Sequence, residues 1–100
     1  MMFNTGLYLF GSYLLSANPN DIDLLWLYDK SEMSPSEILA MVKEQVTLMA
    51  TKLSVPIHRT ILSVAENMEV NFLKQVGAVF VGGFSDGVDV LLEQLGKLKG

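Results

Sequence analysis

Cysteine is absent from the 100-residue sequence, which excludes a disulfide framework and a thiolate metal site. Long hydrophobic runs are also missing, because charged residues interrupt every apolar stretch before it approaches the ~20 apolar residues of a membrane-spanning helix. The first residues, 1–5, lack the basic region that begins a signal peptide. These absences predict a cytoplasmic protein without a membrane segment.

Charge is scarce, with 7 Lys and Arg residues against 11 Asp and Glu and a net charge of −4. The basic residues are scattered singly, so direct nucleic-acid binding, which needs several phosphate contacts on one face, is not expected. Half of the residues are hydrophobic, which excludes disorder and fits a single domain over residues 1–100. So many apolar residues on a small acidic domain also favour an exposed patch that another subunit covers, such as a second copy in a homodimer.

Hydrophobic patterning predicts four strands. Short apolar or β-branched runs are bounded by glycine, proline or polar turn residues, as is typical of strands in a packed sheet. The Asn-Pro-Asn sequence at 18–20 has strong turn chemistry and separates the first two runs. Pro56 fits best at the start of its strand or on a sheet edge. The expected strands are 6–10, 21–28, 55–62 and 78–81.

Three helices are expected between and after these strands. Ser34 with Glu37, and Ser63 with Glu66, have the spacing of capping boxes that open the first two helices. The third helix is expected to be capped near Ser85 or Asp86. Apolar residues recur at helical spacing in each, at Ile38, Val42, Val46, Met49 and Leu53, then Met68, Phe72, Leu73 and Val76 before Gly77, then Val88, Leu91, Leu92, Leu95 and Leu98. The order β-β-α-β-α-β-α predicts an α+β fold, a mixed sheet of about four strands with three helices packed against it.

One segment has the spacing of a phosphate and metal site. Gly11-Ser12 follows the first strand, and after eight further residues Asp21-Ile22-Asp23 opens the second. Residues two apart on a strand point to the same side, so Asp21 and Asp23 place their carboxylates on one face, about 7 Å apart at Cα. Two such carboxylates, completed by phosphate oxygens and water, suit Mg²⁺. Gly11 lets the backbone approach a phosphate, and the Ser12 hydroxyl can hydrogen-bond its oxygens.

With a strand, Gly-Ser and Asp-x-Asp in this order (LFGS…NDIDLLWL), the sequence resembles the polymerase-beta-type nucleotidyltransferases, and especially the minimal nucleotidyltransferases of similar size. The resemblance implies Mg²⁺-dependent transfer of a nucleoside monophosphate from a nucleoside triphosphate to an acceptor hydroxyl. It assigns the triphosphate to Gly11 and Ser12 and the metal to Asp21 and Asp23. By analogy, it also implies a protein partner of the HEPN type, which supplies the acceptor.

The sequence departs from this family at three places. The family usually has a third carboxylate on a later strand, but residues 55–62 contain no Asp or Glu, and His58 or Arg59 stands about where that acid would be. His58 would then be the third catalytic group, as a neutral imidazole ligand or a base, although Mg²⁺ prefers oxygen ligands. Residues 13–15 replace the arginine and glycine that often follow Gly-Ser. The helix that commonly precedes the first strand is also expected to be missing.

Each signal also has a simpler interpretation. Gly11-Ser12 alone suits an ordinary turn, Asp21 alone can cap the Asn-Pro-Asn turn, and a lone strand histidine such as His58 is usually half exposed. Trp26 and Tyr28 could stack a base, but aromatic residues in a strand usually belong to the core. The sequence therefore leaves open an enzyme, a catalytically degenerate module of the same fold that binds a nucleotide or a protein, and a small α+β domain with an accidental resemblance.

Overall fold

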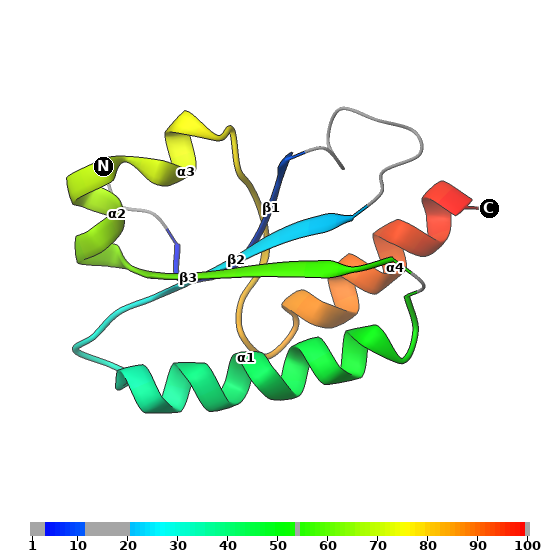
Figure 1. Ribbon diagram of the computed structural model, residues 1–100, viewed down its shortest axis with the longest axis horizontal. Coiled ribbons are helices and arrows are strands. Elements are labelled where there is room, and N and C mark those ends of the chain that lie inside the picture. The colour runs from blue at the N-terminus through cyan, green and yellow to red at the C-terminus, as the bar shows by residue number, and fades with distance from the viewer. Residues whose placement is uncertain (1–3, 12–20, 54, 100) are drawn as a thin grey trace.

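The computed structural model describes residues 4–11, 21–53 and 55–99 (Figure 1). The predicted turn at 18–20 lies outside these residues. Within them the chain forms four strands and four helices, which confirms the predicted α+β class. In chain order these are β1 (Gly6–Phe10), β2 (Ile22–Tyr28), α1 (Pro35–Ala50), β3 (Ile57–Ser63), α2 (Val64–Val70), α3 (Phe72–Gln75), β4 (Val79–Gly82) and α4 (Gly87–Lys99).

The strands make one mixed sheet in the order β3-β2-β1-β4. β1 is antiparallel to both β2 and β4, whereas β3 is parallel to β2. In this register Asp23 of β2 lies between Phe10 of β1 and His58 of β3. Paired residues on neighbouring strands point to the same side of a sheet, so these three side chains share one face.

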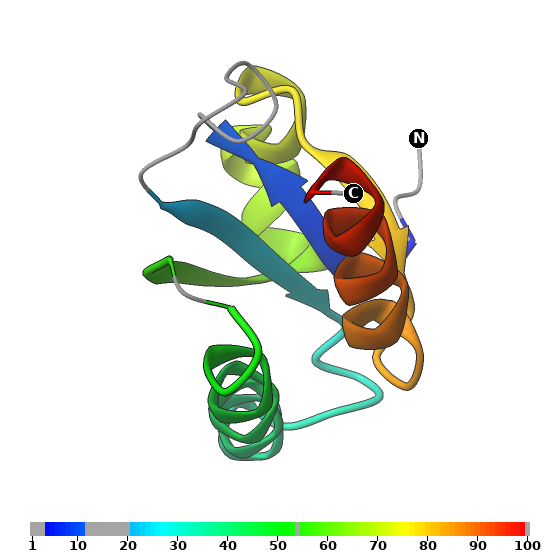
Figure 2. The ribbon, with the colours of Figure 1, turned by 90° about the vertical axis from the view of Figure 1, so that its right-hand side faces the viewer.

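Helices cover the two faces of the sheet unequally (Figure 2). α1 and α4 cover one face, where Trp26 and Tyr28 lie in the main core, as predicted. On the opposite face α2 and α3 pack around Tyr8, Leu25 and Leu27. The far end of that second face, at the start of β2, carries polar residues that are partly or largely open to solvent. The buried residues of the main core are Leu7, Leu9, Ile22, Leu24, Trp26, Tyr28, Ile38, Val42, Met49, Val88, Leu91 and Leu95.

Both predicted capping boxes are present. The Glu37 N–H donates to the Ser34 hydroxyl at 3.2 Å, and the Ser34 N–H donates to the Glu37 carboxylate at 3.1 Å. Ser63 and Glu66 form the same pair of hydrogen bonds at the start of α2. Hydrogen bonds from the backbone and then the side chain of each serine lower the pKa of both glutamates, because they stabilise the ionised carboxylate. Local sequence signals therefore fix where these two helices begin.

The second predicted helix is wrong in its middle. Asn71 has a left-handed backbone (φ 54°), so α2 ends before it and a separate helix, α3, begins at Phe72. Asparagine tolerates this conformation better than most residues. Buried Asn67 holds the break, because its Oδ1 accepts a hydrogen bond of 2.9 Å from the Leu73 N–H. The break also changes which residues face the core. Met68, which the helical spacing places on the apolar face, is 69% exposed.

The start of β3 also differs from its predicted position. β3 begins at Ile57 rather than at residue 55, because Pro56 has no N–H to donate to the strand ladder. The Pro56 carbonyl instead accepts a hydrogen bond of 2.9 Å from the Ile22 N–H. β2 accordingly begins at Ile22, which leaves Asp21 immediately before the strand rather than within it.

The remaining predicted elements agree closely with the structure. β1 has its predicted bounds, and β4 is displaced by one residue from its predicted position. α4 buries Val88, Leu91 and Leu95 as expected, whereas the side chain of Leu98 lies outside the described part of the chain. Among the described residues, no helix has the length and apolar character needed to cross a membrane.

Candidate functional site

Asp23 and Gly11 are in direct contact at one end of the sheet. Asp23 pairs with Phe10, and Gly11 is the next residue along the chain, so the antiparallel register brings it against the Asp23 side chain. A Cβ atom at Gly11 would collide with the Asp23 carboxylate, and the Gly11 backbone has a φ of 82°. Glycine alone meets both requirements without strain. The structure thus gives Gly11 a role that the sequence did not reveal, which is to make room for a carboxylate.

Asp21 and His58 form a second contact, on the other side of β2. The His58 Nε2 lies 3.0 Å from the Asp21 Oδ2, within the distance of an ion pair when the imidazole is protonated. The backbone hydrogen bond from Ile22 to Pro56 holds the start of β2 beside β3 and so brings the two side chains together. The His58 side chain is 61% exposed and that of Asp21 is 35% exposed, so solvent and solutes reach this pair.

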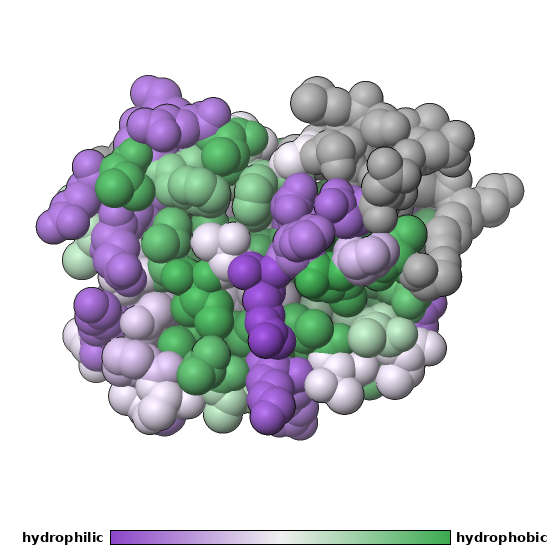
Figure 3. All heavy atoms as spheres, in the orientation of Figure 1, coloured by the Kyte–Doolittle hydropathy of each residue, from purple (hydrophilic) through white to green (hydrophobic). Residues whose placement is uncertain are grey.

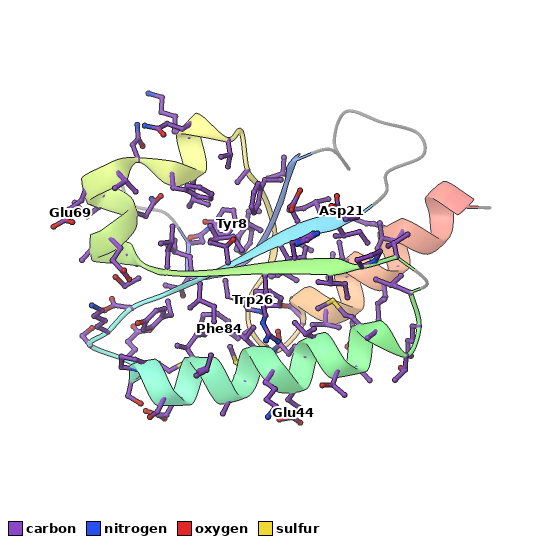
Figure 4. All side chains as sticks on the ribbon, in the orientation of Figure 1. Tyr8, Asp21, Trp26, Glu44, Glu69 and Phe84 are labelled. Carbon is purple, nitrogen blue, oxygen red and sulfur yellow. The ribbon has the colours of Figure 1, made fainter. Side chains whose placement is uncertain are left out.

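The predicted site residues Asp21, Asp23 and His58 therefore lie together at one end of the sheet. Figure 4 shows Asp21 at the start of β2, away from α2 and α3. The two carboxylates nevertheless turn to different neighbours, because Asp23 faces Gly11, just after β1, whereas Asp21 faces His58 on β3. Arg59 follows His58 on the same strand and so points to the opposite face. Ser12, the remaining predicted site residue, lies outside the described residues.

The donor atoms at this end of the sheet fit a divalent cation only in part. Across residues 4–11, 21–53 and 55–99, no three or more His, Asp or Glu side chains are grouped so that they could hold a metal ion. Mg²⁺ in proteins, however, often takes one or two carboxylates and completes its shell with substrate phosphates and water. Asp21 and Asp23 match that smaller donor set. The site therefore suits an ion that arrives with a phosphate ligand better than an ion bound alone.

An aromatic pair borders the acidic end of this face. Phe10, the neighbour of Asp23 in the sheet, packs edge-to-face on Phe72 of α3, with ring centroids 5.5 Å apart. This pair separates the polar residues from the apolar core beneath α2 and α3. In the space-filling view, hydrophilic residues gather over β3 and the start of β2, with hydrophobic residues to both sides (Figure 3). The sequence did not mark Phe10 as a neighbour of the site, because only the register between β1 and β2 places it there.

A surface hollow of about 400 Å³ lies elsewhere, between α1 and the connection from β4 to α4. It is on the face of the sheet opposite Asp23, on the side of Trp26 and Phe84 (Figure 4). Its lining residues are Met41, Glu44, Gln45, Leu48, Phe84 and Ser85. None of these belongs to the predicted site.

The contact between Gly11 and Asp23 predicts a large effect of a small substitution. Gly11→Ala adds a side chain at positive φ, which costs about 1–2 kcal/mol, and also forces the Asp23 carboxylate to move. Gly77→Ala is the matched control, because Gly77 has a φ of 65° but no atom within 4 Å of the added Cβ. Urea unfolding should therefore show a greater loss of stability for Gly11→Ala than for Gly77→Ala. Equal losses would mean that displacement of the Asp23 carboxylate costs no free energy.

Comparison with known proteins identifies no relative of this chain. No protein-family model, curated protein or solved structure matches it. Its function is therefore inferred from its own residues and their geometry.

Proposed function

We propose that the chain is a nucleotidyltransferase-type domain, which binds a nucleoside triphosphate with Mg²⁺ and transfers the nucleoside monophosphate to an acceptor hydroxyl. The observation that carries this proposal is the meeting of Gly11 with Asp23, beside Asp21, where β1 ends and β2 begins. The sequence resemblance assigns the triphosphate to this Gly-Ser segment and the metal to this Asp-x-Asp segment. A cytoplasmic location, where nucleoside triphosphates are available, belongs to the same proposal.

Under this proposal each residue has a distinct task. Asp21 and Asp23 hold the metal, and Gly11 with Ser12 binds the triphosphate. A bound divalent ion neutralises the charge that develops on the phosphoryl oxygens and aligns the attacking and leaving groups. The sheet supplies positioning, because backbone pairing fixes Asp23 beside Gly11 on one side and His58 on the other. The acceptor hydroxyl belongs to a partner, such as a HEPN-type helical protein by analogy with the family that the sequence resembles.

A specific observation favours a second candidate, a catalytically degenerate module of the same type. The resemblance expects a third carboxylate on the strand that corresponds to β3, and His58 stands there, with its Nε2 3.0 Å from the Asp21 Oδ2. An imidazole already engaged with one carboxylate supports Mg²⁺ less well than a third carboxylate would. Such a module binds a nucleotide and acts through contacts with a partner protein or a second copy of itself, without transfer.

Two measurements separate these candidates. Calorimetric titration of wild-type protein with ATP and Mg²⁺ reports binding, and an assay of pyrophosphate release reports transfer to an acceptor. Binding with release supports the enzyme, binding without release supports the degenerate module, and the absence of binding overturns both. Glu69→Gln is the control variant, because Glu69 is an exposed carboxylate on α2, away from Asp21 (Figure 4). Its binding should equal that of the wild type.

A further inference from the structure

We infer that Asp21 and His58 form a binding site for a divalent transition-metal ion, such as Zn²⁺. The acidic end of the sheet would then select this kind of ion over Mg²⁺. The inference deepens the proposed function by replacing its Mg²⁺ with a transition-metal ion, and the nucleotide-bound form of the site rests on that function. It begins from the distance of 3.0 Å between the His58 Nε2 and the Asp21 Oδ2. These two atoms are the ones that an imidazole and a carboxylate use to bind a metal.

Their separation is close to that of two neighbouring ligands on one ion. With bonds of about 2.1 Å, adjacent ligands lie about 3.0 Å apart around an octahedral ion and about 3.4 Å apart around a tetrahedral one. Both atoms can therefore bind one ion after a movement of a few tenths of an ångström. The ion takes the Nε2 lone pair of a neutral imidazole whose single N–H proton is on Nδ1, so no proton is released; an imidazolium would first lose its Nε2 proton to solvent.

The surroundings also suit a cation that arrives from solvent. β3 is an edge strand, and the His58 side chain is 61% exposed, so the approach to the pair is open. Asp23 lies beside His58 in the sheet and adds a second negative charge to the same face. The described residues hold no group of three metal-binding side chains, so two protein ligands alone should bind an ion weakly. Phosphate oxygens of a nucleotide would complete the shell and tighten binding.

The chemistry of the donors determines which ion is selected. Mg²⁺ strongly prefers oxygen ligands, whereas imidazole suits Zn²⁺ and other first-row transition ions. A carboxylate in place of His58 would present only oxygen to the ion and would favour Mg²⁺. The identity of residue 58 is thus expected to set the preference, with Asp21 as a ligand in either case.

The single histidine of the sequence gives a direct measurement. A ¹⁵N NMR spectrum of the imidazole contains signals from His58 alone, and we expect Zn²⁺ to shift the Nε2 signal whereas Mg²⁺ leaves it unchanged. Asp21→Asn should weaken Zn²⁺ binding at least tenfold although the imidazole is still present. Arg59→Gln is the control, because Arg59 is the exposed neighbour of His58 on the opposite face and its loss should change nothing.

A second arm tests selection in the presence of nucleotide. Calorimetry with ATP and either Zn²⁺ or Mg²⁺ gives the ratio of the affinity with Zn²⁺ to the affinity with Mg²⁺. His58→Asp should lower this ratio at least tenfold. An Nε2 signal that Zn²⁺ does not shift, or Zn²⁺ binding that is unaffected by Asp21→Asn, would overturn the inference and leave an ordinary contact between the two side chains. If the pair bound Zn²⁺ but the protein bound no nucleotide, the metal-binding site would be upheld and only the proposed function would be overturned.

Discussion

Replacement of Trp26 by alanine is expected to lower the free energy of unfolding by about 3–5 kcal/mol, the range typical of a large aromatic side chain lost from a packed core. Trp26 is 0% exposed at the centre of the core between the sheet, α1 and α4. A domain of this size is stable by only about 5–15 kcal/mol in total. Urea unfolding should therefore show a protein that has lost a large part of its stability, or that is already partly unfolded in buffer.

The effect extends beyond packing because Trp26 belongs to a chain of hydrogen bonds. Its Nε1–H donates to the Gln45 Oε1 at 2.7 Å, and the Gln45 Nε2–H donates to the Phe84 carbonyl at 2.8 Å. Gln45 thereby joins β2, α1 and the connection that leads into α4. Removal of the indole leaves the side-chain oxygen Oε1 of Gln45 without its hydrogen-bond donor, which adds to the free-energy cost of the cavity.

Two further variants separate these contributions. Trp26→Phe keeps most of the ring volume but lacks the N–H, so its loss of stability should be well below that of the alanine variant. Leu39→Ala, at a side chain that is 59% exposed, should change stability by less than about 0.5 kcal/mol. A Trp26→Ala protein as stable as the Leu39→Ala protein would contradict this description of the core.

Features that depend on a few neighbouring residues could be predicted from the sequence. The capping boxes at Ser34 and Ser63 are such features, because three residues of chain contain both partners of each hydrogen bond. The strand 6–10 was equally clear, since glycine bounds its apolar run. The left-handed backbone of Asn71 could not be predicted in this way, because asparagine is tolerated both in this conformation and within a helix. Here the hydrogen bond between buried Asn67 and Leu73 favours the left-handed conformation.

The contacts within the candidate site depended on information that the sequence does not contain. Placing Asp21 and Asp23 close together required only the spacing of two residues. Placing His58 against Asp21 required the parallel pairing of β2 with β3, and placing Asp23 against Gly11 required the antiparallel register of β1 with β2. Neither pairing follows from local propensity, because a shift of one residue would turn every side chain to the other face.

Replacement of Asp23 by asparagine should weaken nucleotide binding and leave the fold intact or slightly more stable. Loss of a residue that only supports a metal ligand already costs about 10- to 100-fold in affinity, so loss of a proposed ligand should cost about 100-fold or more for ATP with a divalent ion. Asp23→Asn also removes one of two neighbouring like charges on an exposed end of the sheet. That change should raise the free energy of unfolding by up to about 1 kcal/mol, or leave it unchanged.

The opposite signs of these two effects distinguish a binding residue from a structural one. Asp89→Asn is the matched control, since Asp89 lies in the first turn of α4, where a negative charge favours the helix dipole. That variant should bind nucleotide like the wild type and lose about 0.3–1 kcal/mol of stability. If Asp23→Asn lost stability instead and kept its affinity for nucleotide, the carboxylate would serve the fold through its contact with Gly11. If Asp23→Asn lost affinity for nucleotide but no stability, the carboxylate would serve binding rather than the fold. The sheet would then hold Asp23 beside Asp21 in spite of their repulsion, as a cation-binding site requires.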